Sequence, residues 1–356
     1  MIMQDLGFNF IDSHIHQWDP LNTPHSARMA VKVFGRYPAV LDKVIRLVKP
    51  KELIESLGQT VYVTSPYLPQ NYQQDLGPYQ AEQVVHIEAH WHDDRGKGVV
   101  GETRFIESLP FDTTRTQLGA IVATADPRQS NFKKILKLHA KNSSRLRGIR
   151  RMGAVHEDKG ILAWADQPHL YTDKKFLKGF EQLAQHQLSF DAWVYSTQLQ
   201  DLIQLARQFP ETSIVLDHLG TPAGIFGKVG KNTGLTQTGR DNIFYQWQED
   251  IAELATCPNI YTKMSGLMMP VLGHQFHKDK RLSTKQQMID LLSPMILHAL
   301  KSFGTYRVMF GSNFPMDKVS TSLVSLIDAY SDIVASYDAS ALKNIFYDNA
   351  RQFYRL

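Results

Sequence analysis

The 356-residue sequence lacks the features that mark several protein classes. It has one cysteine, Cys257, which excludes an intramolecular disulfide framework and any zinc site built from paired cysteines. Its apolar runs are too short to span a bilayer, and the first residues have no basic stretch leading into an apolar one. No run of five or six Lys or Arg accompanies the net charge of +4. We therefore expect a soluble, cytoplasmic protein without a nucleic-acid or membrane partner.

The composition is that of an ordinary globular protein. Hydrophobic residues make up 43% and charged residues 21% of the chain, which excludes disorder as its main state. The length equals about two average domains, but an α/β barrel can use such a chain as one unit. No repeat, low-complexity tract or Pro/Gly/Ser linker divides the sequence. A single domain over residues 1–356 is predicted.

Short apolar runs alternate with amphipathic helical patterns, which favours parallel strands joined by right-handed crossovers. The strand candidates are Asn9–His14, Thr60–Thr64, Gln83–Glu88, Leu118–Thr124, Leu146–Arg151, Leu188–Ala192, Ser213–His218, Asn259–Lys263 and Tyr306–Gly311. The helical patterns are Leu68–Leu76, Thr172–Gln187, Gln198–Gln208, Asn242–Thr256, Ser283–Ser302 and Ser320–Tyr337. We place Thr60–Thr64 in a long connection instead of the sheet. Eight strands remain, which predicts an α/β protein with a (β/α)8 barrel.

Connection lengths support this barrel. The turns that enter strands are short, as at Phe209–Thr212 and Cys257–Pro258. The segments that leave strands are long: Gln17–Pro66, His90–Gly98, Leu219–Asp241 and Ser265–Lys280. In a (β/α)8 barrel the loops that follow the strands build the active-site face. The long loops therefore predict a functional site, with the insertion over residues 17–67 as its largest part.

Polar residues collect at the ends of the candidate strands. They are Asp12, His14, His16, Glu88, His90, Arg150, Arg151, Asp191, Asp217, His218, Lys263, Ser265, Asn313 and Asp317. Residues two apart on a strand point to the same side, so His14 and His16 can present two imidazoles to one point. Such a pair offers two nitrogen ligands to a divalent metal.

Seven segments, taken in order, resemble a known family. They are FIDSHIHQW (10–18), LRGIRR (146–151), LSFDAWVY (188–195), IVLDHLGTP (214–222), YTKMSGL (261–267), VMFGSNFPMD (308–317) and DNARQFYRL (348–356). Together they resemble the amidohydrolase-related family, described as metal-dependent hydrolases of TIM-barrel fold, which includes sugar lactonases and a pyrone-dicarboxylate lactonase. The resemblance implies a distorted (β/α)8 barrel. It matches His14, His16 and His218 to the family's histidines and Arg150 to an arginine that faces an acidic substrate group.

Two positions depart from the wider superfamily. The fifth strand has Asp191 and no histidine ligand, and the eighth strand ends in Asn313 where an aspartate usually activates water. An asparagine amide cannot take a proton near pH 7, so the general base must lie elsewhere. Asp191 is the first candidate, Glu88 the second and Asp317 the third.

Other residues carry two interpretations each. Lys263 is either a substrate contact or an ion pair inside the barrel, and Glu88 is either a rim residue or a substrate contact. One of Arg150 and Arg151 should face the barrel mouth, with the other in a structural ion pair among the helices. Trp18 and Trp193 lie where an indole ring could wall a pocket.

The predicted function is hydrolysis of a small cyclic ester, a sugar-acid or carboxylated lactone. Catalysis would use His14, His16, His218, Asp191 and Asn313, and the substrate would contact Arg150, Glu88, Lys263, Trp18 and Trp193. A divalent metal, zinc by ligand type, would bind His14, His16 and His218, but metal-free catalysis is an equal alternative. The rival functions are a metal-dependent non-oxidative decarboxylase and a sugar-acid-binding barrel without catalysis. The substrate would be a small anionic or sugar-derived molecule, and a homo-oligomer is left open.

Overall fold

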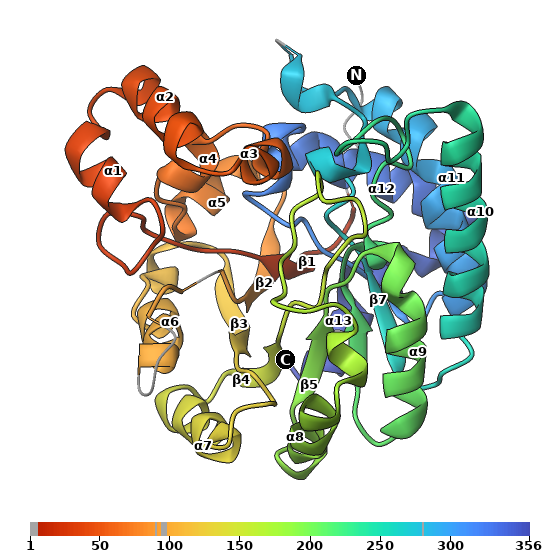
Figure 1. Cartoon of the computed structure of the whole chain (residues 1–356). Helices are drawn as coiled ribbons and strands as arrows, with labels where there is room; N and C mark the ends of the chain where they lie inside the picture. The colour runs from red at the N-terminus through yellow and green to blue at the C-terminus, as the bar shows by residue number, and fades with distance from the viewer. Residues whose placement is uncertain (1–5, 90, 94–97, 280) are drawn as a thin grey trace.

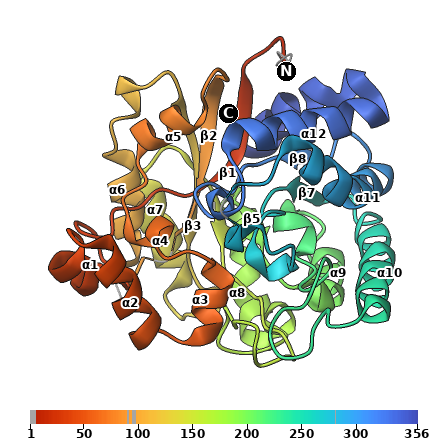
Figure 2. The ribbon, with the colours of Figure 1, turned by 90° about the horizontal axis from the view of Figure 1, so that it is seen from above.

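The computed structural model describes residues 6–89, 91–93, 98–279 and 281–356. Eight parallel strands follow one another in sheet order from β1 to β8. They are β1 (Phe10–Ile15), β2 (Ala81–Ile87), β3 (Gln117–Thr124), β4 (Leu146–Arg150), β5 (Ser189–Ala192), β6 (Ile214–Leu216), β7 (Ile260–Met264) and β8 (Val308–Phe310). Helices surround the strands on the outside (Figures 1 and 2). This arrangement is a (β/α)8 barrel of the α/β class.

The barrel closes between its first and last strands through a few backbone bonds. The N–H of Asn313 donates to the carbonyl of His14 at 2.8 Å, and the N–H of His16 donates to the carbonyl of Phe314 at 2.8 Å. Register shifts interrupt the pairing between β1 and β2, between β2 and β3, and between β3 and β4. The barrel is therefore distorted on one side, as the family resemblance implied.

The strand predictions are confirmed to within a few residues at each end. The longest differences are at β6 and β8, which are shorter than predicted. Thr60–Thr64 does not join the sheet, since Val61–Thr64 forms the short helix α4. Asp217 and His218, predicted to end the sixth strand, lie instead in the tight turn that follows it, Asp217–Gly220.

Thirteen α-helices lie in the part of the chain that the structure describes. They are α1 (Arg28–Phe34), α2 (Pro38–Val48), α3 (Lys51–Leu57), α4 (Val61–Thr64), α5 (Pro69–Asp75), α6 (Gly101–Glu107), α7 (Phe132–Asn142), α8 (Lys174–Gln185), α9 (Leu199–Gln208), α10 (Gln237–Leu254), α11 (Lys285–Phe303), α12 (Leu323–Asp338) and α13 (Asn349–Tyr354). The Asp173 carboxylate caps α8 by accepting from the N–H groups of Lys175 and Phe176. The helix α10 begins five residues before its predicted start, because Thr236 caps it by accepting from the N–H of Gly239.

The insertion after β1 begins and ends side by side at the barrel. The N–H of Trp18 donates to the carbonyl of Tyr67 at 3.2 Å, and the N–H of Tyr67 donates back to Trp18 at 2.9 Å. Between them lie α1 to α4, with α1 and α2 at the edge of the molecule (Figures 1 and 2). Their small apolar cluster is separate from the barrel core and contains the buried residues Ala27, Leu41, Ile45 and Ile54.

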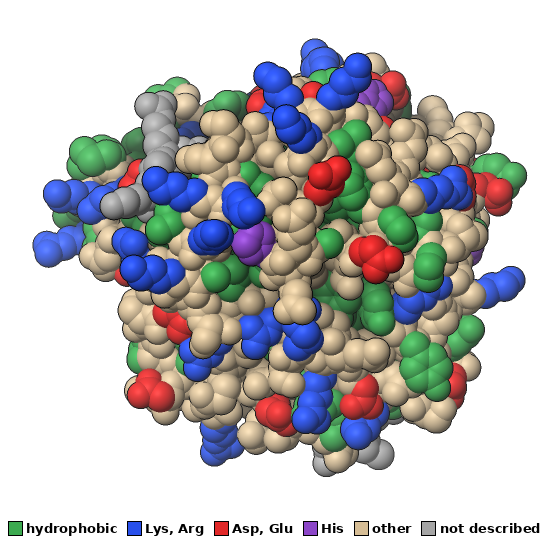
Figure 3. Space-filling view, turned by 90° about the horizontal axis from the view of Figure 1, so that it is seen from below, with side chains coloured by type: hydrophobic (Ala, Val, Ile, Leu, Met, Phe, Trp, Pro, Cys, Tyr) green, Lys and Arg blue, Asp and Glu red, His purple; other side chains and the backbone are tan. Residues whose placement is uncertain are grey.

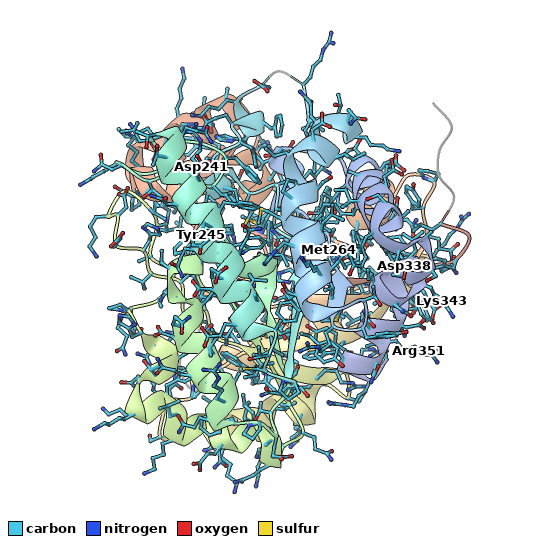
Figure 4. All side chains as sticks on the ribbon, turned by 90° about the vertical axis from the view of Figure 1, so that its right-hand side faces the viewer. Asp241, Tyr245, Met264, Asp338, Lys343 and Arg351 are labelled. Carbon is cyan, nitrogen blue, oxygen red and sulfur yellow. The ribbon has the colours of Figure 1, made fainter. Side chains whose placement is uncertain are left out.

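The outer surface is polar, and the helices turn their apolar faces inward. Tyr245 lies on the outer face of α10 and is 64% exposed, whereas Met264 at the end of β7 is fully buried (Figure 4). On the face that Figure 3 shows, Lys and Arg side chains are spread with acidic side chains between them. Within the described residues, the helices that are long enough to cross a membrane are too polar to do so.

Candidate active site

A cavity of about 310 Å³ opens at the carboxyl ends of the strands. Five polar side chains that end or follow strands line it: His16, Glu88, Arg150, His218 and Asn313. Indole rings of Trp18, Trp164 and Trp193 wall it, as the sequence predicted for two of them. Side chains of the insertion complete the lining opposite the polar group. The cavity therefore has a polar floor on the barrel and a roof on the insertion, where apolar side chains such as Leu53 and Leu57 stand beside polar ones such as Lys49 and Ser56.

Lys263 holds two carboxylates and a histidine together inside the barrel. Its Nζ lies 2.6 Å from Asp191 Oδ2, 3.2 Å from Asp217 Oδ1 and 3.3 Å from His14 Nδ1. All four side chains are fully buried. Burial alone would raise the pKa of Asp217, but the Lys263 ammonium and the His14 ring hold it well below its usual range. Asp217 is therefore a carboxylate at neutral pH.

His14 lies at the centre of the site with one nitrogen occupied. Its Nδ1 is 3.3 Å from Asp217 Oδ1, while its buried Nε2 has no hydrogen-bond partner among the described residues. Burial lowers the pKa of His14 well below its usual value, so the ring is neutral. The ring centroids of His16 and His218 lie 5.0 Å and 4.5 Å away. The rings of His16 and His218 are thus both neighbours of the His14 ring, and the three predicted histidines lie together.

Arg150 lies between two carboxylates. Its Nε donates to Glu88 Oε1 at 2.9 Å, its Nη2 donates to the Glu88 carbonyl at 2.7 Å, and its Nη1 is 3.5 Å from Asp217 Oδ2. Although burial disfavours its charge, these two carboxylates raise the pKa of the guanidinium further. Arg150 lines the cavity, as predicted for one of the two arginines, and Arg151 forms an ion pair with Asp126 at 3.5 Å.

A hydrogen-bonded chain runs from β1 to the turn after β8. The Nδ1 of His16 lies 2.9 Å from the Ile87 carbonyl, and its Nε2 faces Asn313. The amide of Asn313 lies 3.2 Å from that Nε2 and 2.9 Å from Asp317 Oδ1. The Asn313 Nδ2 donates to Asp317 Oδ1, and the Asn313 Oδ1 faces His16 Nε2. Burial raises the pKa of Asp317 to about 7. Asn313 thereby links the two groups without titrating itself.

Backbone geometry fixes His218 at the cavity. His218 has a φ of 57°, and its Nδ1 lies 2.8 Å from the Ser265 hydroxyl. Gly266 has a φ of 64°, and a Cβ at this position would run into the imidazole of His218. Burial lowers the pKa of His218 to about 3, which leaves the ring neutral.

The described residues include one group that fits a metal ion. Ligand atoms of His14, Asp217 and His218 all lie within 4.8 Å of one another, and all three residues are buried. Two imidazoles and one carboxylate suit zinc with a fourth position left open. The buried Nε2 of His14, which has no hydrogen-bond partner among the described residues, is available as a ligand atom. This group differs from the predicted trio in one member, since it contains Asp217 where the sequence suggested His16.

The remaining predicted residues occupy different places. Among the described residues, Asp191 and Lys263 do not line the cavity but share an interior ion pair, and Asp191 also accepts from the Tyr354 hydroxyl at 2.8 Å. Glu88 lines the cavity, whereas Asp317 acts on it through Asn313. His90 lies outside the described residues. Of the three base candidates, only Glu88 is in reach of a ligand.

The sequence did not predict a role in the site for Asp217. The residue appeared among the strand-end polar side chains but only as a neighbour of His218. The turn after β6 brings its carboxylate to His14, Arg150 and Lys263 together. The adjacent Asp-His pair was the available signal, and its meaning depended on a turn that periodicity does not reveal.

The fold and this buried group define a (β/α)8-barrel protein with a cluster of titratable side chains at the carboxyl ends of its strands. The chain belongs to the amidohydrolase family, whose model matches residues 11–356. An uncharacterised protein of Sinorhizobium fredii is 28% identical over 99% of this chain and 100% of its own length. An L-fucono-1,5-lactonase of Burkholderia multivorans is 26% identical over 65% of this chain and 69% of its own length.

Solved structures share the fold. A zinc-bound amidohydrolase from Burkholderia multivorans superposes with a TM-score of 0.70 at 21% identity, covering 98% of this chain and all of that one. A 5-carboxyvanillate decarboxylase from Sphingomonas paucimobilis gives 0.52 at 12% identity, covering 98% and 99%. The family and the lactonase relatives support an enzyme, and the decarboxylase shows that the same fold carries a second chemistry.

Proposed function

We propose that this protein hydrolyses a lactone, a small cyclic ester. The observation that carries the proposal is the polar floor, where one carboxylate, one guanidinium and neutral imidazoles face a single cavity. The L-fucono-1,5-lactonases among the relatives support the proposal that the bond cleaved is the ester bond of a lactone. A sugar-acid or carboxylated lactone is the substrate that the sequence favoured.

Glu88 takes the proton from the attacking water in the proposed mechanism. It lines the cavity and is held by Arg150, so its carboxylate has a fixed position. As water adds to the lactone carbonyl, negative charge develops on the carbonyl oxygen. Arg150 and the imidazole of His218 are the groups on the floor that can stabilise this charge. Collapse of the adduct breaks the ring C–O bond, and the alkoxide takes back the proton from Glu88.

His14, Asp217 and His218 are the residues that would hold a divalent metal. Such an ion would polarise the carbonyl and lower the pKa of a bound water. Lys263 keeps Asp217 ionised and Ser265 orients His218, and both functions serve the site with or without the ion. The metal therefore fits the residues that are present.

The test is a lactone screen that follows acid release with a pH indicator, coupled to metal analysis of the purified protein. We expect turnover of at least one lactone, and we expect Glu88→Gln to lower kcat by about 100-fold or more, as loss of a general base does. The control is Glu107→Gln, because Glu107 forms a partly exposed ion pair with Arg145 and should leave kcat unchanged. A folded Glu88→Gln variant with full activity would contradict the assignment.

The second candidate function is a non-oxidative decarboxylase, supported by the structural neighbour of that activity. Release of carbon dioxide from aromatic carboxylic acids, with no hydrolysis of any lactone, would favour it. Binding of lactones without turnover would favour a barrel that only binds its ligand.

A further inference from the structure

Two apolar side chains on the roof of the cavity lie outside the hydrophobic clusters of the protein. Leu53 and Leu57 lie four residues apart on α3, so they share one face of the helix, and both line the cavity. Within the described residues, neither belongs to the barrel core or to the small cluster of the insertion. Both are half-buried. Leucines kept half-buried at a cavity wall gain from burial only when an apolar ligand covers them.

Three polar groups on the same side are already hydrogen-bonded within the insertion. The Thr64 hydroxyl donates to the Thr60 carbonyl at 2.9 Å, and His25 Nδ1 accepts from the N–H of Ala27 at 3.2 Å. The Lys49 ammonium donates to the Ser26 carbonyl at 3.5 Å. Sugar hydroxyls that enter a cavity must find partners, because a buried hydroxyl without a hydrogen bond weakens binding. The part of the roof formed by Leu53 and Leu57 therefore suits carbon better than hydroxyl groups.

The floor favours a neutral substituent. Arg150 is already paired there with Glu88 at 2.9 Å, and its Nη1 lies 3.5 Å from Asp217 Oδ2. A substrate carboxylate would have to displace a carboxylate from this buried pair, which costs free energy. A neutral substrate avoids that cost.

We propose that the substrate is a neutral lactone with an alkyl or acyl substituent, its ring on the polar floor and its tail against Leu53 and Leu57. This inference rests on the proposed lactonase function, and it replaces the acidic or sugar-derived substituent that the sequence predicted with an apolar one. Trp164 and Met269, which also line the cavity, can cover the tail from the barrel side. The polar ring and the apolar tail then each meet the matching part of one cavity.

The test uses γ-lactones that differ only in an unbranched tail, from methyl to heptyl, on the carbon next to the ring oxygen. In the wild-type protein we expect kcat/KM to rise about fourfold per added methylene until the cavity is full. Leu53→Gln and Leu57→Gln keep the side-chain length and make the roof polar. Each should lower kcat/KM at least tenfold for the pentyl lactone and less than twofold for the methyl lactone.

The matched control is Leu47→Gln, the same substitution on α2 at a side chain that is 86% exposed and does not line the cavity. It should leave the tail dependence unchanged. The inference would be overturned if kcat/KM of the wild type did not change with tail length, or if both α3 variants kept the wild-type preference for long tails. A sugar lactone turned over faster than every alkyl lactone would do the same while leaving the proposed function intact.

If no lactone is hydrolysed, the proposed function fails, and binding then decides the inference. Tetrahydrofurans with the same tails are neutral ring analogues that cannot be hydrolysed, and calorimetry measures their affinity. Affinity that rises with tail length in the wild type and is lost in Leu57→Gln supports the apolar roof. Equal affinity for short and long tails overturns it.

Discussion

The barrel and the insertion between Trp18 and Tyr67 are stabilised in different ways. The barrel buries ion pairs such as Lys263–Asp191 and an apolar core that runs through all eight strands. The insertion buries four apolar side chains of its own, and its helix α1 has no buried residue. The rigid part supplies the chemical groups, and the lightly packed part supplies the roof. In the proposed function, the catalytic groups thus come from the densely packed barrel, and the groups that bind the substituent come from the lightly packed insertion.

The largest expected effect falls on the barrel side. Gly266→Ala adds a Cβ that runs into the His218 ring, and we expect kcat/KM to fall by about 100-fold, as a misplaced catalytic group does. Gly304→Ala is the matched control, because Gly304 also has a positive φ, 71°, but nothing lies within 4 Å of the added carbon. Both variants should lose about 1 kcal/mol of stability through backbone strain. Equal activity in the two variants would show that His218 is not held by this contact.

The insertion can be tested by removing it. Since Trp18 and Tyr67 are hydrogen-bonded to each other, a four-residue Gly/Ser linker in place of residues 21–64 should leave the barrel folded. We expect the free energy of unfolding in urea to fall by less than about 3 kcal/mol, because the separate cluster of the insertion leaves with it. Preference for tailed lactones should disappear. An unfolded product would mean that the two regions form one cooperative unit.

The smallest expected effect is a pH dependence of barrel stability at Glu102. Burial, with the nearby charge of Glu88, raises the pKa of Glu102 to about 8. The folded state therefore binds more protons than the unfolded state between about pH 4.5 and 8, and stability falls as pH rises through that window. Glu102→Gln removes this loss, so the free energy of unfolding of the variant should fall less than that of the wild type between pH 5 and pH 9. Glu107→Gln, at a partly exposed ion pair, should follow the wild type at every pH.

Much of the site was predictable from local pattern. The alternation at His14 and His16, the strand before Arg150 and the strand before His218 placed these side chains at one end of the barrel. Four helices in the insertion were not predicted. Three of them are only four to seven residues long, whereas α2 has eleven residues with an amphipathic pattern and was missed.

The sequence by itself determined the barrel, since strand periodicity and the contrast between short and long connections depend only on nearby residues. Tertiary structure decided which strand-end groups meet. Asp217 joined His14 because the chain turns sharply after β6, and Asp191 was drawn away from the cavity by Lys263 and by Tyr354 on α13, 163 residues along the chain. Such contacts between distant segments leave no local period, so only the folded chain shows which carboxylate reaches a ligand and which stays inside the barrel.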